Sequence, residues 1–290
     1  MHAHRPGEAK VLRRIDDWGV SFVAAAIVAA EGVVERRGET GRAVRIASVT
    51  KPLLARAVAV AVEEGTLALD TPAGPPFSTV RHLLAHAGGY GFDGPQVLAR
   101  PGTRRIYSNT GFERLGSVLA VRSDMDVGEY LHDAVFGPLE MTSSQLRGSP
   151  AKDVWSTVDD LARFARELLR PELVAPATAN EFATVQFPEL AGILPDVGRF
   201  DPNPWGLGVE IRGTKAPHWT GTANSPQTFG HYGGSGTFMW VDPRIGRALV
   251  VLTDRPFGPW ALTEWPRLSD DVVAASPMSR SASGERRHVP

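Results

Sequence analysis

The distribution of apolar residues predicts strands near both ends of the chain and helices between them. Val20–Ala30 and Val33–Arg37 are two extended runs around Glu31-Gly32, which is typical of a β-hairpin. The segment Ser48–Glu64 that follows is apolar on nearly every side. It predicts a helix that begins with a capping serine and lies buried in the centre of the molecule.

The middle of the chain has helical periodicity, and a Pro/Gly-rich stretch at Asp70–Ser78 separates it from the first helix. Helices are expected at Val80–Ala85, at Thr110–Val121 and from Ser156 onward, where acidic residues occupy the first turn. The proline-spaced segment Pro188–Pro204 is expected to end this helical region.

The C-terminal third returns to strand patterns. Strands are expected at Gly206–Arg212, Gly236–Val241 and Arg247–Thr253, and a short helix at Pro266–Ala275 closes the fold. The polar tail after Ser276 is expected to be disordered.

Composition excludes several classes of protein. A chain of 290 residues with 42% hydrophobic residues can bury a large core without a staple. Cysteine is absent, so disulfides, thiolate zinc sites and cysteine nucleophiles are excluded. The formal net charge of −1 gives no reason to expect a nucleic acid or an anionic membrane as partner. A small neutral or weakly charged substrate fits better.

The apolar run Val20–Ala30 is too short to span a membrane as a helix. It follows two arginines and therefore imitates a signal peptide, but Asp16 and Asp17 interrupt the basic region. Cleavage there would also remove a strand of the core. We expect a cytoplasmic protein without membrane insertion, and export stays as the alternative.

Only four lysines accompany 27 arginines, and they are Lys10, Lys51, Lys152 and Lys215. Arginine does not lose its proton in proteins, so a basic amine for catalysis must come from these four. Ser48-Val49-Thr50-Lys51 places a hydroxyl and an amine on one face of a helical turn. A serine becomes a good nucleophile when a deprotonated neighbour takes its proton. The same spacing also fits an ordinary helix cap with a surface lysine.

A second copy of this spacing, Ser149-Pro150-Ala151-Lys152, lies in a proline-containing loop without a buried helix after it. We interpret it as a coincidence. His82 and His86 share a helical face, but no third ligand is apparent, and we expect neither a metal nor another cofactor.

Two further clusters carry usable chemistry. Tyr107-Ser108-Asn109 offers a phenol that can shuttle a proton and an amide that can bind a substrate carbonyl and orient the lysine, although a turn tyrosine before a helix cap explains it equally. His231-Tyr232-Gly233-Gly234 precedes a strand. Its glycines would let a substrate lie along the strand edge, and the N–H of Gly234 could join that of Ser48 in an oxyanion hole. A plain glycine-rich turn is the alternative.

The three clusters together resemble the penicillin-recognising serine hydrolases, the family of the serine β-lactamases and D-Ala-D-Ala peptidases. Here the family motifs stand as SVTK, YSN and HYG. The likeness extends over residues 20–255 and includes RHLLAHAGGY (81–90), PGTRRIYSNTGFERLG (101–116), PLEMTSS (138–144), WSTVDDLARFARELL (155–169), WGLGVE (205–210) and GSGTFMWVDP (234–243).

The resemblance implies a role for each motif residue. Ser48 would attack the acyl carbon, and Lys51 and Tyr107 would manage its proton. The substrate would be bound by Asn109, His231, Gly233 and Gly234.

The resemblance also implies an α/β (α+β) fold: an antiparallel sheet flanked by helices, from residues 1–70 and 201–275, with a mainly helical lobe inserted at 71–200 and a disordered tail at 276–290. The catalytic cleft would lie between the two parts.

The departures from the family bear on the substrate. His231 stands where the lactamases carry a lysine that attracts a carboxylate, and an imidazole is mostly neutral at pH 7. No acidic deacylation loop of the class A type is recognisable. The sequence therefore predicts hydrolysis of a small carboxylic ester or related amide. A D-Ala-D-Ala carboxypeptidase or weak β-lactamase, and a non-catalytic sensor with the same fold, are the alternatives. The physiological substrate, the efficiency of deacylation and the oligomeric state are left open.

Overall fold

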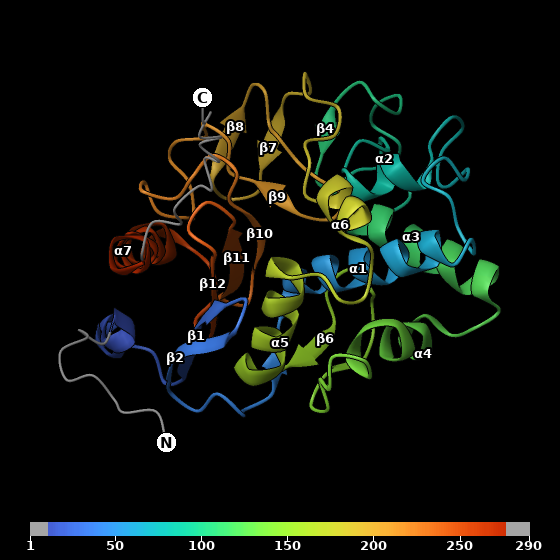
Figure 1. Ribbon diagram of the computed structural model, residues 1–290. Helices are drawn as coiled ribbons and strands as arrows, with labels where there is room; N and C mark the ends of the chain where they lie inside the picture. The colour runs from blue at the N-terminus through green and yellow to red at the C-terminus, as the bar shows by residue number, and fades with distance from the viewer. Residues whose placement is uncertain (1–10, 277–290) are drawn as a thin grey trace, which may run out of the picture.

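The computed structural model describes residues 11–276 and is built around one six-stranded antiparallel sheet (Figure 1). The strands run in the order β2-β1-β12-β11-β10-β9. Their bounds are Val23–Ala29 (β1), Gly32–Arg37 (β2), Glu210–Ile211 (β9), Phe229–Gly233 (β10), Thr237–Asp242 (β11) and Arg247–Thr253 (β12). N-terminal and C-terminal segments thus form a single sheet, and the rest of the chain lies between them in sequence.

Strand β1 is apolar at every position because both of its faces are covered. In β1, Ala24, Ala26 and Val28 belong to one hydrophobic core, whereas Ala25 and Ile27 belong to another. This division follows the two-residue period of a strand. The continuous apolar run therefore indicates burial on both faces.

Each face of the sheet carries its own helical layer (Figure 1). One core joins the sheet to α1 (Thr50–Glu63) and α5 (Val158–Leu169). The other joins it to α7 (Pro259–Ala275) and the 3₁₀-helix η1 (Val11–Asp17). Trp265 of α7 is wholly buried against Phe238 of β11, with ring centroids 4.5 Å apart.

A group of helices lies around α1 on the side away from α7 (Figure 1). These are α2 (Val80–Leu84), α3 (Asn109–Ser123), α4 (Val127–Leu131) with the π-helical turn η3 (His132–Phe136), and α6 (Pro176–Phe182). The expected division of the chain, with an inserted lobe at 71–200, stays a prediction. Within that range, α5 packs on the large sheet against β1 and β12.

Two small sheets connect the layers. One consists of β3 (Val44–Arg45), β6 (Val154–Ser156) and β5 (Gln145–Leu146), and the other of β4 (Arg105–Ile106), β7 (Gly192–Leu194) and β8 (Gly198–Phe200). The first pairs the residues just before Ser48 with a segment over 100 positions away in the sequence.

The predicted hairpin, the strand at 247–253 and the helices near 50, 80, 110 and 158 are confirmed. Other predictions were wrong in detail. The glycine-rich segment around His231 is the buried strand β10. The last helix begins at Pro259 and contains Pro266. The tail predicted to be disordered lies outside the described residues except for Ser276.

The residues of β1 overlap the run that imitates a signal peptide, and they form a strand between β2 and β12. Among residues 11–276, no helix combines the length and the apolar character that crossing a bilayer requires.

The docking of α7 generates a stability prediction. Trp265→Ala removes a wholly buried indole between α7 and the sheet, so the free energy of unfolding should fall by about 3–5 kcal/mol. Val121→Ala on α3, whose side chain is 81% exposed, should stay within about 0.5 kcal/mol of the parent. Urea unfolding followed by fluorescence and circular dichroism measures both. Equal midpoints for the two variants would contradict the packing described.

Candidate active site

The backbone turns sharply just before the central helix, and this turn presents Ser48. Ser48 lies in the 3₁₀ turn η2 (Ala47–Val49), one residue before the cap of α1 at Val49. The prediction that Ser48 caps the helix was therefore wrong, because neither cap makes a side-chain hydrogen bond. Ala47 has φ +47°, a left-handed conformation that costs a residue with a Cβ some free energy. The serine hydroxyl is thus available at the start of the helix.

Strand β10 approaches this turn closely, and Gly233 permits the approach. A Cβ at Gly233 would lie 2.6 Å from the carbonyl oxygen of Ile46 and 3.0 Å from Cβ of Ala47. No side chain fits at that distance, so glycine is required here. The end of β10 is therefore held directly beside Ser48.

Lys51 is wholly buried, and its amine meets three oxygen atoms. Nζ lies 3.3 Å from Ser48 Oγ, 2.7 Å from Asn109 Oδ1 and 3.0 Å from the carbonyl oxygen of Ala151. None of the three is a carboxylate. Burial, and after it the positive charge of Lys152, hold the pKa of Lys51 well below its usual range.

Tyr107 lies beside this amine, with its ring centroid 4.7 Å from Lys51 Nζ. Burial raises the pKa of the phenol far above its usual value, and a hydrogen bond with Ser48 partly offsets the shift. The phenol is therefore protonated at neutral pH. His86 packs on the ring at a centroid distance of 4.4 Å, and its Nδ1 accepts a hydrogen bond from the backbone N–H of Ser108.

Asn109 is the first residue of α3, and its amide bridges two parts of the site. The cap of α3 is Ser108, whose Oγ accepts from the N–H of Gly111, so the helix-cap reading applies to Ser108. The amide of Asn109 accepts from Lys51 through Oδ1 and donates through Nδ2 to Asp93 Oδ1 at 3.1 Å. Its position fits the predicted orienting role.

His231 lies in the middle of β10 and is almost fully buried. Its Nδ1 donates to the carbonyl oxygen of Tyr232 at 2.7 Å, since a carbonyl can only accept. Burial lowers the pKa of His231 to about 3. The imidazole is neutral, and its Nε2 lone pair has no hydrogen-bond partner among residues 11–276.

A cavity of about 250 Å³ joins these groups. Its lining includes Ser48, Tyr107, Asn109, His231 and Gly234. All but two of the predicted site residues thus line one cavity; Lys51 lies buried behind Ser48, and Gly233 supports the wall formed by β10. The shared wall of Ser48 and Gly234 agrees with the predicted oxyanion hole.

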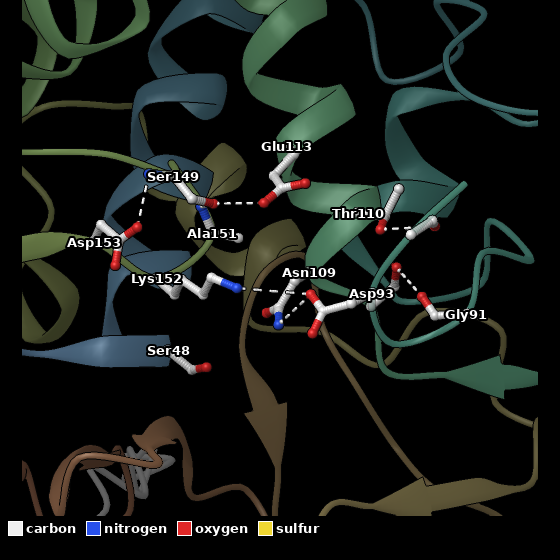
Figure 2. A network of polar contacts seen from close by, with 12 residues as sticks. Ser48, Gly91, Asp93, Asn109, Thr110, Glu113, Ser149, Ala151, Lys152 and Asp153 are labelled. Carbon is white, nitrogen blue, oxygen red and sulfur yellow. Dashed lines mark hydrogen bonds and ion pairs between the residues drawn. The ribbon is translucent and has the colours of Figure 1, made fainter. Parts of the chain in front are cut away.

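Sequence reasoning missed part of the site. Asp93 and Lys152 also line the cavity, and the loop that carries Lys152 provides the Ala151 carbonyl for Lys51. The interpretation of the second Ser-x-x-Lys spacing as a coincidence was therefore wrong for its lysine. Ser149 donates to Glu113 Oε1 at 2.8 Å and supports the loop (Figure 2). The scarcity of lysine was the one signal that could have found Lys152.

The two histidines considered as metal ligands have other contacts. His82 Nδ1 pairs with the hydroxyl of Thr79 at 2.9 Å, and His86 supports Tyr107. Within residues 11–276 there is no group of three or more His, Cys, Asp or Glu side chains suited to a metal ion.

An antiparallel sheet flanked by helices, with serine, lysine and tyrosine at one cavity, defines the class of the β-lactamase and transpeptidase fold. The Beta-lactamase family model matches residues 22–274, and the chain belongs to this family of serine hydrolases.

Individual relatives agree with that membership. A solved structure described as a beta-lactamase from Mycobacterium bovis is 52% identical, with a TM-score of 0.91, over 92% of this chain and all of that one. EstCE1, described as a hydrolase with promiscuous acyltransferase activity, shares the fold at 16% identity and a TM-score of 0.74, over 91% of this chain and 98% of that one.

A protein from Escherichia coli O157:H7 named "Putative D-alanyl-D-alanine carboxypeptidase" is 24% identical over 56% of this chain. The chain spans about half the length of the curated relatives it matches, 48% in this case.

The buried neutral imidazole predicts a pH dependence of stability. Below about pH 6.5 the unfolded chain protonates His231, whereas the folded protein resists protonation until about pH 3. The contribution of His231 to stability is thus complete above pH 6.5 and is lost as the pH falls. The free energy of unfolding should fall by up to about 1.4 kcal/mol per pH unit between these limits on account of this residue.

Urea unfolding at a series of pH values measures this slope. His231→Asn should reduce it by the share of this residue, whereas Val121→Ala, at a side chain 81% exposed, should leave it unchanged. Identical slopes for the parent and His231→Asn would show that His231 is not buried as a neutral imidazole.

Proposed function

We propose that the protein is a serine hydrolase that forms an acyl-enzyme on Ser48 and hydrolyses a small carboxylic ester or a related amide. The observation that carries the proposal is the environment of Lys51. Its amine is wholly enclosed, bonded to two carbonyl oxygens, and within 3.3 Å of the serine hydroxyl.

The hydrogen-bond inventory of the amine supports its role as the base. A neutral amine has two N–H donors and one lone pair. The carbonyl oxygens of Asn109 and Ala151 occupy both donors. The lone pair is then left for the proton of Ser48, which is the requirement for activating a serine. Burial of Lys51 lowers its pKa and therefore favours this neutral form.

The protonated phenol of Tyr107 is suited to donating a proton rather than removing one. After Ser48 attacks the acyl carbon, its proton passes to Lys51. The leaving alcohol or amine then receives a proton through Tyr107, which is replenished from Lys51. The N–H groups of Ser48 and Gly234 would stabilise the oxyanion, and water would release the acid from the acyl-enzyme.

The neutral state of His231 favours an uncharged acyl substrate. Its free Nε2 can accept a hydrogen bond but offers no positive charge to a carboxylate. A β-lactam or a peptide terminus would therefore gain less from this wall than from a lysine. An ester or simple amide loses nothing.

A D-Ala-D-Ala carboxypeptidase is the second candidate function, and the names of the curated relatives favour it. A non-catalytic sensor with the same fold is the third reading. The three candidate functions differ in the substrate that acylates Ser48: a small ester or amide, a D-Ala-D-Ala peptide, or none.

One comparison of substrates separates the three. The protein is incubated with a short-chain nitrophenyl ester, a chromogenic cephalosporin and a D-Ala-D-Ala peptide, and turnover and intact mass are measured. Fast ester turnover with an acyl adduct supports the proposal. Cleavage of the peptide alone supports the carboxypeptidase, and the absence of both turnover and adduct supports the sensor.

Variants assign the chemistry to residues. Ser48→Ala should abolish turnover and the adduct, and Tyr107→Phe should lower kcat by about 100-fold or more, the usual contribution of a positioned proton donor. Ser117→Ala, an exposed serine on α3, is the matched control and should retain full activity. An adduct that persists in Ser48→Ala would place the nucleophile elsewhere.

A further inference from the structure

Two charged residues outside the three family motifs, Asp93 and Lys152, line the cavity. Asp93 contacts the side of Asn109 opposite Lys51, and Lys152 contacts Asp93 (Figure 2). Asp93 belongs to the loop after α2, and Lys152 to the loop before β6. Their charged atoms, Nζ of Lys152 and Oδ1 of Asp93, are 3.7 Å apart.

Asp93 determines which way the amide of Asn109 points. A carboxylate only accepts hydrogen bonds, so it can be bonded only by the Nδ2 end of the amide. That leaves Oδ1 for Lys51, as observed. A reversed amide would place two oxygens together at Asp93 and two N–H groups together at Lys51. Without Asp93, nothing in this pair of contacts selects one orientation.

The loop that carries Asp93 is fastened to the start of α3 by three consecutive residues. The Oγ of Ser108 donates to Gly91 and the hydroxyl of Thr110 donates to Gly94, at 2.7 and 3.0 Å (Figure 2). Between them, the backbone N–H of Asn109 donates to the carbonyl oxygen of Phe92 at 2.8 Å. These three hydrogen bonds fix the position of Asp93 relative to Asn109. The carboxylate itself is about half exposed, so its contact with Lys152 does not serve to satisfy a buried charge.

The loop of Lys152 is linked to the amine of Lys51 by two routes. The residue before Lys152, Ala151, bonds Lys51 directly, and Lys152 reaches the same amine through Asp93 and Asn109. Ser149 holds the loop by bonding Glu113 through its side chain and Asp153 through its backbone N–H (Figure 2).

We propose that Asp93 and Lys152 are a positioning pair for the catalytic centre: Asp93 fixes the amide of Asn109 with its oxygen on Lys51, and Lys152 holds Asp93 in that place. The proposal rests on the proposed function in that it takes Lys51 as the base. It adds two residues that act through Asn109 without touching the reacting atoms.

Asp93 and Lys152 carry opposite charges near the amine of Lys51, so their effects on its pKa have opposite signs. The charged groups around Lys51 are Lys152, Asp93 and Glu113. The other titratable neighbours, His86, His231 and Tyr107, are uncharged near neutral pH because burial moves the pKa of each away from 7. Lys152 lowers the pKa of Lys51, whereas Asp93 raises it. Removing one charge or the other must therefore shift the titration in opposite directions.

The test compares Asp93→Asn and Lys152→Gln by the pH profile of kcat/KM on the nitrophenyl ester. The acid limb should move to lower pH in Asp93→Asn and to higher pH in Lys152→Gln, by roughly 0.5 to 1 unit for a single charge at this range. Asp133→Asn and Arg122→Gln, which remove the same charges from exposed positions on other helices, should leave the limb in place.

A second pair of variants tests the orienting role separately from charge. Asp93→Asn still offers an acceptor to Nδ2 of Asn109, although its own amide also permits the reversed orientation, and it should lower the plateau rate less than Asp93→Ala does. Asp93→Ala removes the acceptor and should lower the plateau by about 10- to 100-fold, the usual effect of misplacing a catalytic group. Equal plateaus in Asp93→Ala and the parent would overturn the orienting role.

A readout independent of turnover separates this inference from the proposed function. With only four lysines in the chain, the ¹³Cε signal of Lys51 can be assigned with Lys51→Arg and titrated by NMR. Opposite shifts of its pKa in the two variants support the pair, even if no ester is turned over. Ser48-dependent turnover combined with shifts that are absent or of the same sign would overturn the pair and leave the proposed function standing.

Discussion

An amine enclosed in the centre of the protein is the constraint on which the rest of the structure depends. A buried ammonium without a carboxylate partner is costly, so Lys51 is favoured as a neutral amine. A neutral amine in turn needs two acceptors for its N–H groups. Two segments distant in sequence provide them: the start of α3 at Asn109 and the loop at Ala151. The fold can therefore be understood as the means by which these two segments meet at one side chain.

The sheet and its two helical layers make this meeting rigid. Strand β1 is buried on both faces, with α5 packed on one of them, and Lys51 projects from the first turn of α1, which contacts β10. On the cavity side, Gly233 lets β10 approach the turn before Ser48 without a side chain between them. Small residues at such close approaches matter as much as the polar groups, because a shift of one ångström would separate hydroxyl and amine.

Much of this arrangement could be predicted from the chain alone. The hairpin, the central helix and the three motif segments have strong local signals, and six of the predicted residues meet at the cavity, either in its lining or, for Lys51, directly behind Ser48. What could not be predicted depends on long-range contacts. Strand β10 contains two glycines in five residues, and its pairing with β11 is not visible in its composition. Lys152 could not be recognised because nothing local shows that its loop folds back toward Lys51. Asp93 was overlooked for the same reason.

The family membership and the site geometry point the same way, but they establish different things. The match over residues 22–274 places the chain among the serine hydrolases of the beta-lactamase family. The protonation state of Lys51 does not follow from family membership and has to be measured on this protein. A neutron crystal structure at neutral pH tests it most directly. The account predicts two deuterium atoms on Nζ, directed at Asn109 and Ala151, with the hydroxyl deuterium of Ser48 pointing at the nitrogen. Three deuterium atoms on Nζ would contradict it.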